Sequence, residues 1–498
     1  MSLVGLTLTD NVAHASSYLV TTTADGGAGS LRDAITQANA NPGPDTITIP
    51  AGTYTLTIAG RGEDANLTGD LDVTGATTII GAGAGSTIID AAGIDRVFDI
   101  VGGPTVLQGL TITNGAPAVG VTASGGDIKA LNYTGLTIQD SIVSNGSSNY
   151  GGGVLADQGV LTVLRSEFVG NSVVGYFGNG GAAAAIFKTK GSLVLTDSLV
   201  ADNHAGTVGI LAANAAIYVT GGVMTARNST ISGNSAYAWT VLLEAYGATT
   251  VGTSTFDHVT IANNTTVSGG AGLGLNLISP AVMPVTVTGS LFVNNHTGAP
   301  SRNCSFQGGG GGVITSGGYN LSDDTTCPGF TQASDLNNNQ LTTLGALANN
   351  GGPTRTLALV AGSSAIDAAG ACGSVTPTDQ RAVSRPQGVA CDMGAYEVGA
   401  AVVPTTTSTT NAPTTTDAPT TSDAPTSVAP GSTLAEPPIS VDNGGIGATT
   451  LPPETTIELI YRGQLPVTGD NHATSLWLAL LACSMGALLV LTARRLAR

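Results

Sequence analysis

Seven copies of one eleven-residue pattern occupy the middle of this chain, and they constrain its fold more than any other feature. Their sequences are TVLQGLTITNG, LTIQDSIVSNG, LTVLRSEFVGN, LVLTDSLVADN, MTARNSTISGN, STFDHVTIANN and VTVTGSLFVNN, beginning at Thr105, Leu136, Leu161, Leu193, Met224, Ser254 and Val285. The copies align without gaps, and most begin about 31 residues after the previous one. Such a period is typical of a solenoid, in which every repeat forms one coil stacked on its neighbours.

Two columns of this alignment are apolar in every copy. The third holds Leu107, Ile138, Val163, Leu195, Ala226, Phe256 and Val287, and the eighth holds Ile112, Val143, Phe168, Val200, Ile231, Ile261 and Phe292. We expect both columns to point inward, with equivalent residues of successive coils about 4.8 Å apart. The tenth or eleventh place holds Asn114, Asn145, Asn171, Asn203, Asn234, Asn263 and Asn294. This column predicts a turn, because Asn tolerates left-handed backbone angles.

The coils have room for short strands and Gly-rich turns but not for a helix, and the chain has 70 Gly and only 10% charged residues. This composition is typical of β structure. We therefore predict an all-β fold, a parallel β-helix over residues 16–400 with a C-terminal closing module at about 341–397. Ser30 is a good N-cap, and Leu31 and Ile35 share one helical face, which predicts a short helix capping the first coil.

Two stretches near the ends of the predicted β-helix resemble a known family. YLVTTTADGGAGSLRDAITQANANPG, DTITIPAGTYTL and GDLDVTGATTIIGAG look like the opening of bacterial secreted β-helix proteins of the pectate-lyase-like superfamily. NNGGPTRTLALVAGSSAID through TDQRAVSRPQGVACDMGAYE resembles the module that precedes C-terminal anchors in such surface proteins. Together these stretches bracket roughly residues 18–397. The resemblance implies a right-handed helix and an extracellular protein, but many family members have no assigned activity.

The cysteines indicate an oxidising compartment. Cys483 lies in an apolar C-terminal span, and the other four form two pairs that are close in sequence, Cys304 with Cys327 and Cys372 with Cys391. We predict a disulfide within each pair. A zinc site is disfavoured, because the chain has no CxxC and no nearby histidine pair.

The segments on either side of the β-helix are those of an exported protein. Residues 1–15 read as a partial signal peptide, in which Ala13 and Ala15 form a small-x-small cleavage site but no basic residue precedes a short apolar run. We favour a start codon placed too late over a weak signal. Residues 401–464 are rich in Thr, Pro and Ala and cannot bury a core, so we predict a disordered stalk, in which the threonines are potential sites of O-glycosylation.

The last 34 residues contain a pentapeptide, an apolar span and a basic tail, in that order. Residues 473–493 are uncharged and match the about 20 residues of a transmembrane helix. Arg494, Arg495 and Arg498 follow at once, which keeps the tail on the cytoplasmic side of the membrane. The pentapeptide LPVTG comprises Leu465, Pro466, Val467, Thr468 and Gly469.

This three-part order resembles the sorting signal of Gram-positive surface proteins that sortase attaches to the cell wall. The resemblance implies that sortase recognises the pentapeptide, cleaves between Thr468 and Gly469, and joins Thr468 to peptidoglycan. The alternative is a plain membrane anchor with a chance pentapeptide. In either case the β-helix is extracellular, and under the first it is displayed on the cell wall surface.

The charge of the chain excludes one class of partner. The formal net charge is -17, so neither nucleic acid nor an anionic membrane would attract the β-helix. The partners that remain are sortase, peptidoglycan, and an extracellular glycan or a ligand on a host or neighbouring cell.

The fifth column of the repeat carries the candidate catalytic residues. Asp140, Arg165 and Asp197 fall on consecutive coils, and Arg227 lies beside Asp257 in the same register. A polysaccharide lyase needs calcium-binding carboxylates and a basic group, whereas a hydrolase needs two carboxylates. The alternative, which we favour, is an exposed ladder of opposite charges without catalysis.

A second acidic group precedes the repeats. Glu63, Asp64, Asp70 and Asp72 in RGEDANLTGDLDVTG could bind calcium through carboxylate oxygens, although a turn or capping role is favoured. No other cofactor is predicted. His204 and His296 are three coils apart, too far to share a metal ion. Asp379, Gln380 and Arg381 read as a structural closing loop.

These features predict a wall-anchored surface β-helix that acts as an adhesin-like, glycan-binding or structural module. The alternative is an extracellular polysaccharide lyase or glycoside hydrolase that uses the same faces. Flat strand faces suit an extended ligand, and irregular loops, for example residues 172–190 and 265–283, would set specificity.

Overall fold

The computed structural model describes most of the chain up to residue 399. The described residues are 14–117, 124–131, 133–173, 183–206, 215–245, 251–277, 281–298, 302–307, 311–370, 372 and 376–399. Residues 1–13 of the expected signal peptide, the stalk and the sorting signal with its span at 473–493 lie outside them. Within the described ranges, no helix is long and apolar enough to cross a membrane.

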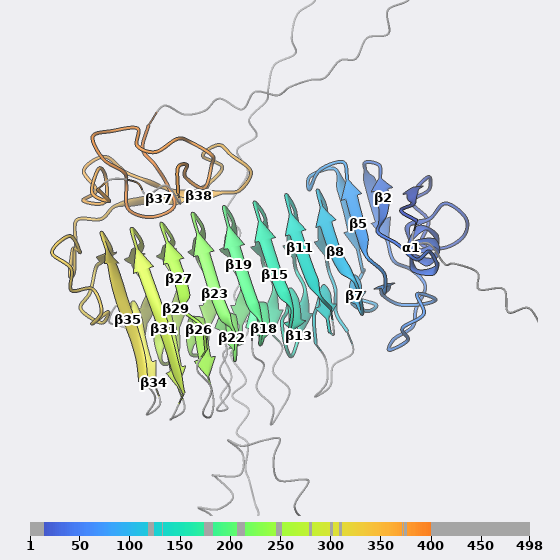
Figure 1. The fold of residues 1–498 in the computed structure, drawn as a ribbon, viewed down its shortest axis with the longest axis horizontal. Coiled ribbons are helices and arrows are strands. Elements are labelled where there is room, and N and C mark those ends of the chain that lie inside the picture. Colours follow the sequence, from blue (N-terminus) through green and yellow to red (C-terminus); the bar gives the residue numbers. More distant parts are fainter. Residues whose placement is uncertain are drawn as a thin grey trace, which may run out of the picture. The chain divides into compact units, whose positions relative to one another are not determined.

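The described chain forms a parallel β-solenoid of about 9 turns (Figure 1). An eleven-stranded sheet runs along it. This sheet contains β1 (Ser17–Leu19), β2 (Asp45–Ile49), β5 (Thr77–Gly81), β8 (Pro104–Gln108), β11 (Gly135–Gln139), β15 (Val160–Leu164), β19 (Ser192–Thr196), β23 (Val223–Arg227), β27 (Ser254–Asp257), β31 (Val282–Thr288) and β35 (Gly311–Gly318). Each strand pairs with its equivalents in the coils before and after it.

Two further long sheets complete the coil. The ten-stranded sheet contains β3 (Gly52–Thr55), β6 (Thr87–Asp90), β9 (Thr111–Thr113), β12 (Ile142–Ser144), β16 (Glu167–Val169), β20 (Leu199–Ala201), β24 (Thr230–Ser232), β28 (Thr260–Ala262), β32 (Leu291–Val293) and β36 (Leu321–Ser322). The nine-stranded sheet contains β4 (Leu71–Val73), β7 (Phe98–Ile100), β10 (Ile128–Ala130), β14 (Val154–Asp157), β18 (Ala183–Thr189), β22 (Ala215–Thr220), β26 (Trp239–Ala245), β30 (Gly270–Leu277) and β34 (Cys304–Gln307).

Two small sheets lie outside this plan. A six-stranded sheet of two-residue strands contains β13 (Ser147–Ser148), β17 (Ser172–Val173), β21 (His204–Ala205), β25 (Ser235–Ala236), β29 (Thr265–Thr266) and β33 (His296–Thr297). Near the C-terminus, β37 (Leu344–Ala348) and β38 (Thr356–Leu359) form an antiparallel pair.

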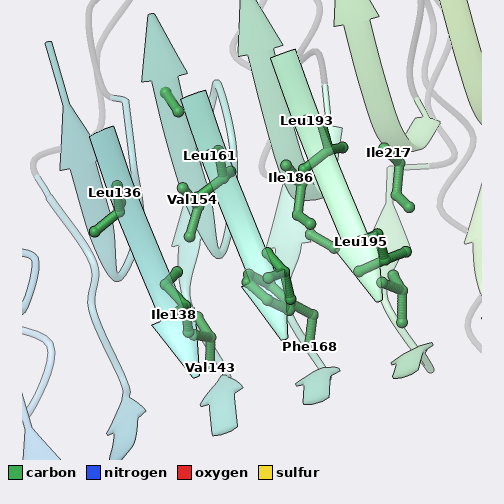
Figure 2. Close-up of a cluster of buried hydrophobic side chains, with 14 of the residues drawn as sticks. Leu136, Ile138, Val143, Val154, Leu161, Phe168, Ile186, Leu193, Leu195 and Ile217 are labelled. Atoms are coloured by element: carbon green, nitrogen blue, oxygen red, sulfur yellow. The ribbon is translucent and has the colours of Figure 1, made fainter. Parts of the chain in front are cut away.

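The predicted core columns are confirmed. Every residue of the third and eighth columns is at most 1% exposed. The third column comes from the eleven-stranded sheet and the eighth from the ten-stranded sheet. Figure 2 shows Ile138 beside Val143, and Phe168 and Leu195 in the coils that follow, with Val154 and Ile186 of the nine-stranded sheet in the same core. Stacking of like residues therefore fills the interior of the coil.

The predicted N-terminal helix is also present, as α1 (Leu31–Ala40). The Ser30 side chain accepts a hydrogen bond from the backbone N–H of Asp33, as a good N-cap does. Leu31, Ile35 and the other apolar residues of one face are buried against the first strands, and Figure 1 shows α1 at that end of the stack.

The Asn column divides into two positions with different roles. At the tenth place, Asn145 and Asn263 have φ of 59° and 60° and make the predicted turn. The eleventh place forms a buried ladder of Asn171, Asn203, Asn234, Asn264 and Asn295. In this ladder the Nδ2 of each Asn donates to the Oδ1 of the next, at 2.9 to 3.0 Å. Asn264 and Asn295 had no assigned role, and an inward ladder was not predicted.

The closing module, at about residues 341–397, packs along the side of the solenoid rather than over its open end. Arg355 donates a hydrogen bond to the carboxylate of Glu167, which is 188 residues earlier in the chain. Gln380 accepts a hydrogen bond from the Thr230 hydroxyl at 2.7 Å. The last coil is covered instead by the segment after β36, where Phe330 packs edge-on against Phe292 with centroids 5.6 Å apart. Both predicted disulfides are present, Cys304–Cys327 and Cys372–Cys391.

Candidate functional site

The fifth column of the repeat lies at the corner between the eleven-stranded and ten-stranded sheets. The register places Asp140, Arg165 and Asp197 on consecutive coils, directly after β11, β15 and β19. Their φ values of 50°, 46° and 50° are left-handed, so this column is a second turn that the sequence reasoning missed. Such angles direct the side chains outward along one edge of the solenoid.

Asp140 and Arg165 form a bidentate ion pair at this corner. Arg165 Nε lies 2.6 Å from Asp140 Oδ1, and Nη2 lies 3.0 Å from Oδ2. Burial acts to raise the pKa of Asp140, but hydrogen bonds from Arg165 and Gln139 outweigh it and the pKa is lowered. The hydrogen bond to Asp140 likewise raises the pKa of Arg165. Each side chain of the pair therefore stabilises the charge of the other.

A pocket of about 230 Å³ opens beside this pair. Its lining includes Asp140, Arg165, Glu167 and Pro353. The Glu167 carboxylate accepts three hydrogen bonds from Arg355, namely from the backbone N at 2.8 Å, from Nε at 3.0 Å and from Nη2 at 2.8 Å. Both carboxylates are therefore held by arginines, and the pocket reads as a joint between the solenoid and the closing module.

From Asp197 onward the column contacts the closing module, through Thr354, Thr378, Thr376 and Gly394, so it is not an exposed face along its whole length. Burial raises the pKa of Asp197 to about 6, partly offset by a hydrogen bond from Asn228. His258 is 4% exposed, and its Nδ1 lies 2.7 Å from Asp257 Oδ1 and 3.2 Å from Thr376 Oγ1.

Arg227 neighbours Asp257 in the strand register, but within the described residues no ion pair joins them. The Asp257 carboxylate contacts His258 instead. The corner thus contains the predicted charges, with Asp140, Arg165 and Asp257 paired and Arg227 exposed.

In the acidic segment before the repeats, two of the four predicted residues, Glu63 and Asp70, bind other groups of the protein. The Glu63 carboxylate accepts from the backbone N–H groups of Ala65, Leu67 and Thr68, at 2.6 to 2.9 Å, and so holds its own loop together. Asp70 pairs with Arg96 at 2.7 Å. Glu63 thus contributes to a turn of its own loop, and Asp70 forms an ion pair.

Asp64 and Asp72 meet a third carboxylate that the sequence reasoning missed. One carboxylate oxygen from each of Asp64, Asp72 and Asp99 lies within 4.8 Å of the others. Asp72 on β4 and Asp99 on β7 are direct partners in the nine-stranded sheet. Burial, followed by the charge of Asp70, raises the pKa of Asp72 to about 7.

The outward face of the nine-stranded sheet carries an aromatic strip, which we define as Tyr150, Phe187, Tyr218, Tyr237 and Trp239. Tyr150 stacks on Phe187 with centroids 6.1 Å apart, and Phe187 stacks on Tyr218 at 5.1 Å. Tyr150, Phe187 and Tyr237 are partly exposed. The rings of successive coils therefore stack on one another, although Tyr218 and Trp239 are only 6% and 5% exposed.

The strip has a glycine at one end and a polar column beside it. A Cβ at Gly274 would collide with the indole of Trp239, so a glycine is needed there for the ring to lie on the sheet. In the neighbouring outward column, Glu244 accepts from the Tyr218 hydroxyl at 2.7 Å and from Asn276 Nδ2 at 2.9 Å. Phe187, Tyr218 and Leu242 are partners on successive strands. They lie outside the eleven-residue repeat, so the repeat did not predict this column.

Comparisons with protein-family models, with curated proteins and with solved structures found no match to this chain. The class of protein that the structure defines is therefore a parallel β-solenoid with one short helix.

Proposed function

We propose that this chain is a surface protein of a Gram-positive bacterium that binds an extended extracellular glycan along the aromatic strip. Display is supported by the sequence alone, through the order of LPVTG, an apolar span and a basic tail, preceded by a Thr/Pro-rich stalk. Sortase would join Thr468 to peptidoglycan. The two disulfides are compatible with an oxidising exterior.

The aromatic strip is the observation that supports glycan binding. Aromatic rings offer a flat apolar surface with a negative face, on which the C–H face of a sugar ring can stack. Rings stacked from coil to coil match a ligand that is itself a linear repeat. Partly exposed Asp157, Thr189, Thr220 and Asn276 lie in the adjacent outward column, where sugar hydroxyls would find hydrogen-bond partners.

Binding is favoured over cleavage of the glycan. The carboxylates nearest to an open pocket, Asp140 and Glu167, are each held by an arginine. A lyase or hydrolase needs groups that can exchange protons. The resemblance to right-handed pectate-lyase-like proteins enters the proposal as fold and location only, because a solenoid of this kind serves binding proteins and enzymes alike.

The proposal is tested with the full-length chain and a panel of neutral and acidic polysaccharides, measured by titration calorimetry. We expect at least one polysaccharide to bind, and Phe187→Ala to weaken it roughly tenfold. The control is Phe306→Ala, which removes an exposed ring from the last strand of the same sheet. Failure of every polysaccharide to bind, or equal binding by both variants and the parent, would refute the assignment to the strip.

Display is tested separately in the native host. We expect Thr468→Ala to release the protein from the wall fraction, because Thr468 carries the carbonyl that sortase would transfer to peptidoglycan. The control is Thr450→Ala, in the stalk. A Thr468→Ala chain that remains covalently linked to peptidoglycan contradicts sortase attachment without affecting the glycan proposal.

A further inference from the structure

We propose that Asp64, Asp72 and Asp99 bind one divalent cation, and that the cation is Ca²⁺. The site lies at the N-terminal end of the nine-stranded sheet, in the coils that follow α1. It is separate from the aromatic strip and from the corner pocket, and it does not depend on the proposed function.

The geometry of the three carboxylates suits a single ion. Asp72 and Asp99 are partners on adjacent strands, and Asp64 reaches them from the loop before β4. Their oxygens lie within 4.8 Å of one another. Since Ca²⁺ binds oxygen at about 2.3 to 2.6 Å, two ligands on opposite sides of one ion are about 5 Å apart. An ion between these oxygens would contact all three residues.

A second observation points to a positive ligand, namely buried oxygens without a donor. Oδ1 of Asp72 and Oδ1 of Asp99 have no hydrogen-bond partner, and the two residues are 0% and 2% exposed. The other oxygen of each is already used. Asp72 Oδ2 accepts from the backbone N–H of Asn66 at 2.7 Å, and Asp99 Oδ2 accepts from Lys129. A buried carboxylate oxygen left without a partner is strongly unfavourable, and a bound cation removes that penalty.

The charge balance of the surroundings agrees. Five carboxylates cluster here, from Asp64, Asp70, Asp72, Asp95 and Asp99, and the cations among them are Arg96 and Lys129. Carboxylates thus outnumber cationic side chains in this cluster. Buried like charges repel each other strongly, so a divalent cation would neutralise part of the excess.

The chemistry of the ligands selects the metal. All three protein ligands are carboxylates, which favour hard cations over zinc or copper. Two of the three are fixed by a sheet and one comes from a loop, and Ca²⁺ tolerates such irregular geometry better than Mg²⁺, which demands a near-octahedral shell.

The ion would tie the loop to the first coils. Asn66 in that loop donates from Nδ2 to the backbone carbonyl of Arg32 in α1 at 2.9 Å, and Arg32 donates to the carbonyls of Gly69 and Asp70 at 2.7 Å. The loop, the helix and β4 thus form one connected unit. We expect Ca²⁺ to stabilise this end of the solenoid.

The test uses the full-length chain, stripped of metal with a chelator and titrated with CaCl₂ or MgCl₂ alone in a calorimeter. We expect one Ca²⁺ per chain, weaker binding of Mg²⁺, and a higher unfolding temperature with Ca²⁺. Asp64→Asn changes an exposed residue, so the fold should persist while Ca²⁺ affinity falls at least tenfold and the thermal shift is lost. The matched control is Asp202→Asn, an exposed, left-handed position far along the chain where Asn fits well.

Two results would overturn the proposal. One is an absence of both binding heat and thermal shift at millimolar Ca²⁺. The other is equal Ca²⁺ affinity in Asp64→Asn and the parent. Tighter binding of Mg²⁺ than of Ca²⁺ would overturn the choice of metal. None of these results bears on glycan binding, which is measured with the Phe187→Ala pair.

Discussion

The inward and outward sides of the nine-stranded sheet follow different rules. Along its inward side, residues in register such as Phe98, Ile128, Val154 and Ile186 are apolar from coil to coil. Along its outward side, one register column changes character. It passes through Asp72, Asp99, Lys129, Leu155, Phe187, Tyr218, Leu242, Gly274 and Ser305.

This difference shows which constraint acts where. Inside, each side chain packs against its equivalents above and below, so the same residue type suits every coil. The outward column lacks that uniformity, because one end of the sheet holds charges and the middle holds rings, although Asp72, Tyr218 and Leu242 are also buried. Two ligands of the proposed cation site, Asp72 and Asp99, belong to one stretch of this column. Two rings of the aromatic strip, Phe187 and Tyr218, belong to another.

One inward position departs from the rule and shows its limit. Lys188 is fully buried, and its ammonium donates to the backbone carbonyls of Gln158, Thr189 and Lys190 at the next turn. Burial lowers the pKa of Lys188 to about 8, partly offset by the charge of Asp157. A charge is thus tolerated inside only where the end of a strand supplies several acceptors.

The largest predicted effect concerns the inward Asn ladder. Asn264→Ala removes donors to Ile231 O and Asn295 Oδ1, and it removes the acceptor of the Asn234 backbone N–H. Because these groups are buried, we expect the free energy of unfolding to fall by about 4 kcal/mol, measured by urea denaturation.

The adjacent residue provides the matched control for that prediction. Asn263 has φ of 60° and lies at the outward turn, so Asn263→Gly keeps a favourable backbone and should cost less than about 1 kcal/mol. Similar losses in Asn263→Gly and Asn264→Ala would show that the inward ladder has no special role.

The second prediction concerns the outward side of the nine-stranded sheet, at Gly274 and Trp239. Gly274→Ala places a methyl group where the Trp239 indole lies, so the ring must move off the sheet. We expect a loss of about 2 kcal/mol in urea denaturation, as for other overpacked sites, together with weaker glycan binding. Gly135→Ala is the control, because its Cβ would have only ordinary contact with Val160 O. A stable Gly274→Ala variant would mean that Trp239 is not fixed against the sheet.

The inward half of this structure could be predicted from sequence, and the outward half only in part. Leu107 and Ile112 predict buried columns because their periodicity recurs in seven coils. The different roles of Asn263 in the turn and Asn264 in the buried ladder could not be predicted, since the tenth and eleventh places of the repeat both hold Asn or Gly in many coils. The position of the closing module could not be predicted either, because its contacts, such as Arg355 with Glu167, join residues far apart in sequence.

The same limit explains what was found and missed at the acidic cluster. Asp64 and Asp72 stand out in a short acidic stretch, so they could be proposed from composition alone. Asp99 is a lone acid in RVFDI, before the aligned repeats begin, and only the pairing of β4 with β7 brings it to Asp72. Such residues are brought together by the register between strands that are far apart in the sequence. Outside the repeats, one sequence alone does not reveal that register.

The third prediction concerns the charged end of the outward column. Lys129→Gln frees Asp99 Oδ2 and removes a positive charge from the proposed cation site. We expect calorimetry to show roughly tenfold tighter Ca²⁺ binding, about 1.4 kcal/mol, and lower stability of the metal-free protein. Lys190→Gln removes an exposed charge elsewhere and serves as the control. Equal affinity in the two variants would show that Lys129 does not act on the site directly.

The smallest predicted effect concerns an outward position that the closing module covers. Burial lowers the pKa of His258 below its ordinary 6.5; the hydrogen bond to Asp257 acts in the opposite direction, Arg385 lowers the pKa and Glu397 raises it. Below pH 6.5 the unfolded chain therefore binds a proton more readily than the folded chain, and the stability contributed above pH 6.5 is lost as the pH falls.

We expect the free energy of unfolding to decline less between pH 7 and pH 5 in His258→Asn than in the parent. Asn suits the left-handed backbone at this position, φ 52°, and carries no charge. His204→Asn is the control, because it removes an exposed histidine that lies outside the closing module. If His258→Asn and the parent have the same pH dependence, then burial of His258 under the closing module does not make the free energy of unfolding depend on pH.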